Sequence, residues 1–238
     1  MSDPKKNLTL FGLILVSISA TALLSAFVFP GSPKVVGPSL GRAWSFAVLG
    51  GSTVTSTGST AITGDLGVSS PGASVTGFPP GTIVQGTQRI GDPSANAAQR
   101  DAQVAYGALA GMACTVPLTG QDLGGKRLAP GVYCFTSSAQ LTGQLVLDAK
   151  GSSKGIWVFQ IASTLTTASN SSVVMGSGSK AANVYWQVGS GATLGTGTAF
   201  SGNILAYSSI TMNTDARLSG RALARSAVTM DSNVMRRP

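Results

Sequence analysis

The chain has 238 residues, of which 43% are hydrophobic, 6% aromatic and only 10% charged, with a net charge of +8. It contains no histidine and no glutamate, the side chains most often recruited for acid–base catalysis, which argues against most hydrolase, metalloenzyme and phosphotransferase chemistry. The 31 glycines and 11 prolines resemble the composition of a linker, but a mean hydropathy of +0.27 argues for a folded chain.

Residues 1–30 are predicted to be a targeting or anchoring segment. Lys5 and Lys6 precede an uncharged run over residues 8–29, which as a helix would be about 33 Å long and could cross a bilayer of about 30 Å. A signal peptide has the same layout with a shorter apolar stretch and a small-x-small cleavage site, which Ala20 and Ala22 could form. Both alternatives stay open, a cleaved signal peptide or a membrane anchor over residues 8–29.

Either alternative makes the protein secreted or extracellular. Residues 31–38, rich in glycine and proline, are then a linker, and residues 39–238 are expected to form one folded domain.

One helix is expected over about residues 93–112. Asp92 is a typical N-cap, and Pro93 is typical of the first helical position. Small apolar residues recur at helical spacing and form one stripe, namely Ala95, Ala98, Ala102, Ala105 and Leu109. This stripe predicts a helix packed closely along the flank of the remaining structure.

The only two cysteines are Cys114 and Cys134. An even number of cysteines in an exported chain favours a disulfide. The alternative, a nucleophilic thiol, would lack a histidine to activate it.

The strongest internal signal is a repeat near the C-terminus with a period of about eighteen residues. Residues 193–210 align with residues 211–228, and residues 229–232 begin a third copy. A fixed short period predicts a solenoid, and eighteen residues at about 3.3 Å each close naturally into a triangular coil of three short strands. Earlier segments match the same template with irregular spacing. We therefore expect an all-β solenoid that is triangular and discontinuous, with the one helix on its flank.

Aspartates do not cluster into a catalytic or metal-binding group. Asp215 and Asp231 fall at different places in successive copies of the repeat, so they form no ladder of carboxylates, and the glycine-rich stretches lack nucleotide- and calcium-binding patterns. We expect no enzyme activity, no catalytic residue, no cofactor and no metal. The largest basic group lies near the C-terminus without interleaved aromatic residues, so a nucleic-acid partner is not expected.

Short hydroxyl side chains repeat instead, in two ladders. The first flanks the inward Val54, Leu165 and Leu194, and its members are Thr53, Thr55, Thr164, Thr166, Thr193, Thr211 and Thr229. The second lies just beyond it, and its members are Thr57, Thr60, Thr167, Asn170, Thr196, Thr198 and Thr214. Strict alternation would turn Thr167 inward, so we expect a corner between the two ladders that lets both face water.

Several separate segments, in order along the chain, closely resemble the microbial ice-binding (antifreeze) domain. They are residues 45–58, 63–68, 130–133, 159–169 and 220–225. The resemblance covers about residues 39–234. It implies a right-handed, discontinuous β-solenoid of triangular section with a flanking helix at the expected place.

The resemblance also implies an ice-binding face with T-[AG]-x-[TN] motifs. Residues 57–60 and 167–170 match this motif, whereas the segments that begin at Thr196 and Thr214 depart from it. The implied function is adsorption of a monomer to ice crystals, which inhibits their growth and recrystallisation. The alternative is an extracellular carbohydrate-binding or adhesive β-solenoid, which would need aromatic platforms on an outer face. Only three tryptophans are present, and Trp157 and Trp186 lie in apolar strand contexts.

Overall fold

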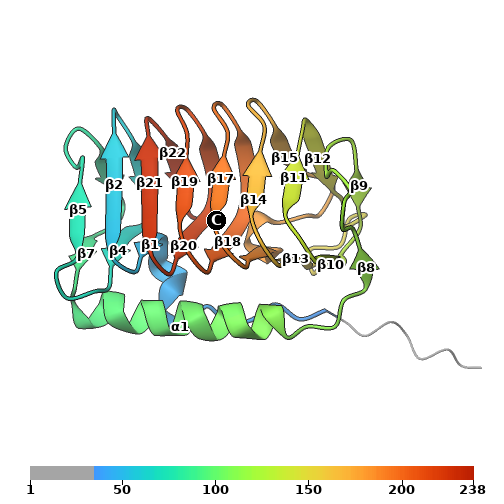
Figure 1. Cartoon of the computed structure of the whole chain (residues 1–238), viewed down its shortest axis with the longest axis horizontal. Helices are drawn as coiled ribbons and strands as arrows, with labels where there is room; N and C mark the ends of the chain where they lie inside the picture. Colours follow the sequence, from blue (N-terminus) through green and yellow to red (C-terminus); the bar gives the residue numbers. More distant parts are fainter. Residues whose placement is uncertain (1–34) are drawn as a thin grey trace, which may run out of the picture. The chain divides into compact units, whose positions relative to one another are not determined.

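Three parallel β-sheet faces wind around one core in the computed structural model, which describes residues 35–238 (Figure 1). The first, which we call the threonine face, is a seven-stranded sheet. Its strands lie in the order β5 (Ser74–Thr76), β2 (Thr53–Thr57), β21 (Ala227–Asp231), β19 (Ile210–Met212), β17 (Ala192–Leu194), β14 (Leu165–Thr167) and β11 (Ala139–Leu141).

The second face packs against the helix, and we call it the helix face. Its strands lie in the order β7 (Gln88–Ile90), β4 (Asp65–Val68), β1 (Phe46–Gly50), β20 (Arg217–Ala224), β18 (Ala199–Ala206), β16 (Val184–Val188), β13 (Trp157–Ile161), β10 (Gly131–Phe135) and β8 (Val116–Pro117).

The third face shares β18 and β20, which are long enough to run around a corner. Its strands lie in the order β6 (Thr82–Val84), β3 (Ala61–Thr63), β22 (Val234–Arg236), β20, β18, β15 (Ser172–Met175), β12 (Gln144–Leu147) and β9 (Arg127–Leu128). Gly202 marks the corner within β18, with a φ of 116° that favours glycine. A methyl group on Gly220, its partner in β20, would overlap the Gly202 carbonyl oxygen, so the two glycines let these corners stack.

The order of coils along the solenoid differs from their order in the sequence. β2 pairs with β21 on one side and with β5 on the other, so the first coil of the chain stacks on the last one. β1 joins β20 in the same way. The predicted discontinuous, triangular β-solenoid with one long helix is confirmed, and the seam between the first and last coils is where the discontinuity lies.

The helix α1 (Pro93–Ala110) connects β7 and β8, the two ends of the helix face, and runs along it (Figure 1). Asp92 caps its first turn by accepting a hydrogen bond from the Ala95 N–H at 2.7 Å. The helix ends two residues before the predicted Met112. All five residues of the predicted stripe are buried, and they pack on Val132, Val158, Tyr185, Leu205 and Leu223 of the helix face.

The solenoid interior is filled by inward side chains of all three faces. Phe159 stacks on Trp186 with ring centroids 3.9 Å apart, and Tyr133 and Phe200 extend the stack on either side. Two short 3₁₀ turns, η1 (Gly41–Ser45) and η2 (Ala181–Asn183), complete the described elements. Arg221 is fully buried under η1, where its guanidinium lies over the Trp44 ring, and burial lowers its pKa to about 10.

The predicted disulfide is confirmed, because Cys114 and Cys134 are bonded to each other. It ties the segment after α1 to β10. Within residues 35–238 no helix is long and apolar enough to cross a bilayer. The predicted signal or anchor over residues 1–30 lies outside the described residues.

Candidate functional site

The threonine face carries a ladder of outward side chains that are in register from strand to strand. Thr193 pairs with Thr211, and Thr211 pairs with Thr229. Thr229 pairs with Thr55 across the seam, where the two hydroxyls lie 3.4 Å apart. Thr166 continues the ladder beyond Thr193. Parallel strands are about 4.8 Å apart, so these threonines repeat at that interval.

The pattern of inward and outward residues in these strands follows strict alternation. Leu194, Met212 and Met230, which flank the ladder, are buried in the core. A second outward row contains Thr53, the first residue of β2, and Thr164, the residue before β14. The Thr164 hydroxyl donates a hydrogen bond to the Ser138 hydroxyl at 2.8 Å. The seven predicted residues of the first ladder therefore share one face.

Three residues of the predicted second ladder face the interior, and our assignment of them was wrong. Thr60, Thr167 and Thr198 are only 0%, 3% and 0% exposed. The Thr167 hydroxyl lies 2.9 Å from that of Thr198 and accepts a hydrogen bond from the Gly195 N–H. The reason is that β14 continues through Thr167, so alternation turns this side chain inward. The corner follows it at Asn170, which has a φ of 61°.

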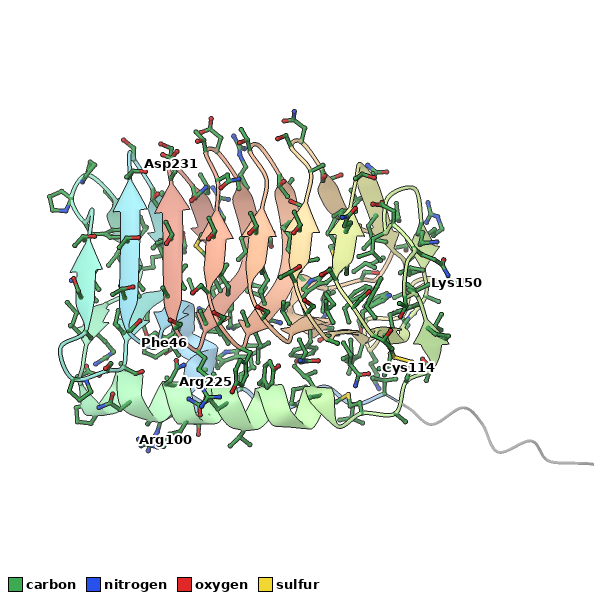
Figure 2. All side chains as sticks on the ribbon, in the orientation of Figure 1. Phe46, Arg100, Cys114, Lys150, Arg225 and Asp231 are labelled. Carbon is green, nitrogen blue, oxygen red and sulfur yellow. A yellow bond between two sulfur atoms is a disulfide. The ribbon has the colours of Figure 1, made fainter. Side chains whose placement is uncertain are left out.

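The other residues of the second ladder are exposed at the corner between the threonine face and the third face. They are Thr57, Asn170, Thr196 and Thr214. Asp231 lies at the same corner and is labelled at the upper edge of the face in Figure 2. The hydrogen bond that Thr214 donates to Asp231 lowers the pKa of this carboxyl below its ordinary value.

The repeat shortens by one residue at this corner in the last coil. Ala199 pairs with Arg217 at the full period, but Arg217 pairs with Val234. Ser232, which has a φ of 52°, therefore does not occupy the place of Thr214 that the repeat predicted. The missing residue changes the spacing only at the corner, and the threonines of the ladder stay in register.

The two ends of the ladder were not predicted from the sequence. Thr76 of β5 pairs with Thr55, and Gln140 of β11 pairs with Thr166, and both are exposed. The signal was present, since Ser74-Val75-Thr76 repeats the alternation of Thr53-Val54-Thr55.

The chemistry of the threonine face is uniform. Along the ladder from Thr76 to Gln140 the outward groups are hydroxyls, methyls and one amide, and Asp215 and Asp231 bring the charges at the corner. The described residues contain no cluster of three or more acidic or cysteine residues that could hold a metal. Trp157 and Trp186 are buried, so neither offers an aromatic platform. A rigid grid of this kind can hold ordered water over a wide area, and the hollow of about 240 Å³ between Thr57, Thr211 and Thr214 is smaller than the roughly 300 to 1,000 Å³ typical of sites for drug-sized ligands.

Comparison with known proteins gives the same family from sequence and from structure. The sequence profile of the Ice-binding-like family matches residues 48–236. The chain is 59% identical to an ice-binding protein of Nostoc sp. over 171 residues, which cover 72% of this chain and 62% of that relative. It is 35% identical to an ice-binding protein of Flavobacterium frigoris, over 72% of this chain and 66% of the relative. The chain thus spans less than two thirds of the length of either relative.

Solved structures extend the match over more of their own length. An ice-binding protein of the Antarctic ascomycete Antarctomyces psychrotrophicus superimposes with a TM-score of 0.81 at 42% identity, covering 84% of this chain and 98% of that one. An ice-binding protein from an Antarctic biological consortium gives a TM-score of 0.82 at 48% identity, covering 88% and 95% of the two chains.

Proposed function

Because the chain belongs to the Ice-binding-like family, we propose that it adsorbs to ice crystals through the threonine face and thereby inhibits their growth and recrystallisation. The observation that carries this assignment is the in-register ladder through Thr55, Thr229, Thr211 and Thr193. A crystal surface is periodic in two dimensions, and the ladder is the outward pattern on this face that repeats from coil to coil.

Rigidity is what makes such a face effective. Each strand of the face is hydrogen-bonded to its neighbours, and the apolar side chains behind β2, β21, β19, β17 and β14 are fully buried. Threonine has few rotamers in a strand, so its hydroxyl and methyl groups are already fixed in position before the protein contacts ice. Little conformational freedom is then lost on docking, which is the main cost that weakens association.

The composition of the face favours ordered water over bound solute. Ammonium and carboxylate groups hold strongly hydrated shells that would compete with the arrangement of water in ice. Each threonine of the ladder carries a hydroxyl and a methyl group instead, so that water can be anchored at the hydroxyls and ordered over the methyls. Many weak contacts then act together without chemical turnover, and the protein needs no cofactor.

The test is direct observation of a single ice crystal growing in a solution of the purified protein. Faceting of the crystal and a gap between its melting and freezing temperatures are expected. Round, unhindered growth at all protein concentrations would refute ice binding by this chain.

We further propose that the protein acts outside the cytoplasm, as a monomer. The Cys114–Cys134 disulfide supports this location, because such bonds persist in oxidising compartments. The uncharged run over residues 8–29 supports export as well. Determination of the mature N-terminus tests the proposal: a start near Leu23 indicates a cleaved signal and an intact start indicates an anchor. A full-length protein confined to the soluble cytoplasm would refute both.

A further inference from the structure

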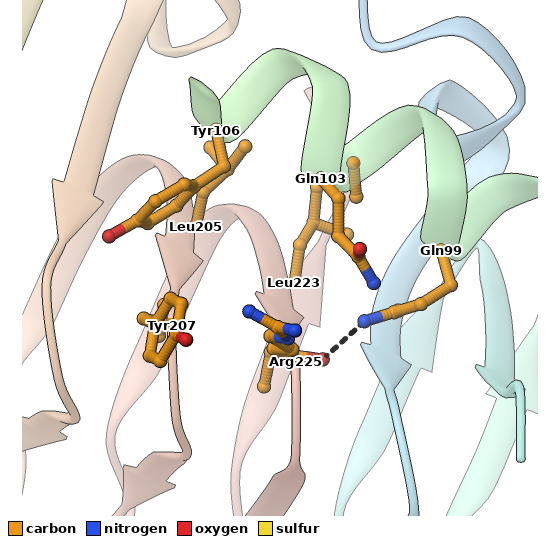
Figure 3. Close-up of a pocket in the computed structure, with 10 residues that line it drawn as sticks. Gln99, Gln103, Tyr106, Leu205, Tyr207, Leu223 and Arg225 are labelled. Carbon is orange, nitrogen blue, oxygen red and sulfur yellow. Dashed lines mark hydrogen bonds between the residues drawn. The ribbon is translucent and has the colours of Figure 1, made fainter. Parts of the chain in front are cut away.

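A small cavity lies on a different face, between α1 and the ends of β18 and β20 (Figure 3). Its volume is about 190 Å³, below the range of roughly 300 to 1,000 Å³ typical of sites for drug-sized ligands. Ala102, Leu205 and Leu223 provide an apolar lining. The space is therefore suited to a single ring with one apolar side.

Gln99 brings an unsatisfied polar group to this cavity. Its side chain is only 7% exposed, and its Nε2 donates to the Ala224 carbonyl oxygen at 3.1 Å (Figure 3). Within the described part of the chain its buried Oε1 has no hydrogen-bond partner. Flipping the side-chain amide of Gln99 would place its Oε1 against the Ala224 carbonyl oxygen, and two acceptors form no hydrogen bond. The Ala224 carbonyl therefore fixes the orientation of the Gln99 amide. A buried acceptor without a donor costs free energy, and a ligand hydroxyl that reaches Oε1 by displacing the atoms that cover it would remove that cost.

A guanidinium stands at the mouth of the cavity. Arg225 lies over the Tyr207 ring at 4.7 Å from its centroid, and Tyr207 is 51% exposed. Among residues 35–238 no carboxylate forms an ion pair with Arg225. Stacking on the ring holds the guanidinium in place, and its fork of donors is free to take a carboxylate with two hydrogen bonds.

Tyr106 forms the remaining wall and offers a donor. Its ring centroid lies 6.1 Å from that of Tyr207, and its hydroxyl accepts a hydrogen bond from Gln187 Nε2 at 2.8 Å. Burial raises the pKa of Tyr106, so the hydroxyl keeps its proton at neutral pH. The hydrogen bond from Gln187 does not use that proton, and the Tyr106 side chain lines the cavity.

From these groups we propose that the cavity binds one uronic acid unit of an acidic polysaccharide. The sugar carboxylate pairs with Arg225, a ring hydroxyl donates to Gln99 Oε1, and another accepts from Tyr106. The apolar side of the sugar ring packs on Leu205 and Leu223. The protein would thus be held on an anionic glycan by one face while the threonine face stays free for ice.

Other ligand classes fit the same groups less well. A neutral hexose leaves the Arg225 charge without its partner. A nucleotide carries more phosphate charge than one guanidinium neutralises and a larger body than the cavity accepts. The net charge of +8 adds a long-range attraction for a polyanionic chain.

The experiment is a calorimetric titration of the full-length protein with D-glucuronate, with D-glucose and with a short oligomer of uronic acid. We expect glucuronate to bind at least tenfold more tightly than glucose, and the oligomer to bind at least as well as glucuronate. In the variant Arg225→Gln, the ratio of the affinities for glucuronate and glucose should fall at least tenfold. The control Arg100→Gln removes the same charge from an exposed position of α1 (Figure 2) and should bind like the original protein.

A second variant, Gln99→Met, removes the unsatisfied acceptor and should weaken the binding of glucuronate and of glucose by a similar factor. No measurable binding of glucuronate or the oligomer would overturn the proposal. Equal affinity for glucuronate and glucose would overturn it too, as would equal effects of Arg225→Gln and Arg100→Gln. Thermal hysteresis measured on the same samples should be unchanged in all three variants, so failure of the sugar site and failure of ice binding are distinguished.

Discussion

Thr211→Tyr is the sharpest perturbation of the threonine face. Thr211 lies in β19, the fourth of seven strands, and is flanked by Thr193 and Thr229 in the ladder. A tyrosine reaches roughly 4 Å further from the backbone than a threonine, close to the spacing of about 4.8 Å between strands. A gap of only about 0.5 to 1 Å already forfeits a quarter to a half of a dispersion contact. Even a tilted ring therefore lifts the neighbouring strands out of contact with a flat crystal.

The folded structure should tolerate this change. The side chain points outward, and the inward Ile210 and Met212 are untouched, so the free energy of unfolding should change by no more than about 0.5 kcal/mol. Thermal hysteresis, in contrast, should fall several-fold. Both quantities are measured on the same preparation, by osmometry on single ice crystals and by thermal unfolding.

Ser219→Tyr provides the matched control. Ser219 is exposed in β20, the strand that follows in the same coil, but it lies on the third face. It should keep both the hysteresis and the melting temperature. Equal hysteresis in the two variants would show that ice is bound elsewhere on the triangle, and a large drop in the melting temperature of Thr211→Tyr would show that Thr211 supports the fold.

Three further changes test other parts of the structure. Thr167→Val leaves the buried Gly195 N–H without its acceptor, so unfolding measurements should show a loss of about 1 to 3 kcal/mol, with hysteresis unchanged while the protein is folded. Replacing both Cys114 and Cys134 by serine opens a loop with a sequence separation of 20 and should cost about 3 kcal/mol of stability; an unchanged denaturation midpoint would contradict this. The pKa of Asp231 lies below its ordinary value of 3.8 because Thr214 donates to it, so its contribution to stability is present above pH 3.8 and is lost as the pH falls through the folded value. Melting temperatures of the original protein and of Asp231→Asn should therefore converge as the pH is lowered below 3.8.

The sequence predicts the repeating parts of this protein well, because alternation and period are properties of the chain itself. Thr193, Thr211 and Thr229 recur at one period, and the same spacing closes one coil on the next. The helix was equally predictable, since Asp92, Pro93 and the alanine stripe act through local geometry.

The corners were predicted less well, since their position depends on backbone conformation that no single residue type marks. The left-handed residue of the corner after the threonine face is Asn170 in one coil, Gly197 and Asp215 in the next two, and Ser232 in the last. Glycine tolerates this conformation because it has no Cβ atom, and Asn and Asp tolerate it because their short polar side chains can hydrogen-bond locally. Thr167 was therefore placed beyond a corner that the chain reaches only three residues later.

Contacts between segments that are distant in the sequence could not be predicted from the sequence. The similar patterns of residues 53–55 and 227–229 indicate equivalent coils, but not that the first coil stacks on the last. The cavity beside Gln99 is of the same kind, because α1 meets β18 and β20 only in the folded structure.

The seam between the first and last coils gives a last prediction, which couples folding to the threonine face. Gly51 lies in the corner between β1 and β2, where an added methyl group would overlap the backbone carbonyl oxygen of Arg225. Beside it the Ser52 N–H donates to the Ser226 carbonyl oxygen at 2.8 Å, the hydrogen bond that precedes the pairing of β2 with β21. Because a backbone group cannot move aside like the end of a flexible side chain, Gly51→Ala must displace the corner and the first residues of β2.

Gly51→Ala should therefore lower the free energy of unfolding by about 1 to 3 kcal/mol, the usual cost of overpacking. It should also reduce hysteresis in the molecules that remain folded, because Thr53 and Thr55 lose their register with Thr229. Gly107→Ala adds the same methyl group in the last turn of α1, where nothing lies within 4 Å of it, and should not destabilise the protein, because glycine inside a helix costs roughly 0.5 to 1 kcal/mol relative to alanine. Chemical denaturation of both variants, together with hysteresis at a temperature where both are folded, checks the pair. If Gly51→Ala is as stable and as active as Gly107→Ala, the corner at Gly51 does not pack against the Arg225 carbonyl oxygen, and the threonine face cannot be continuous across the seam.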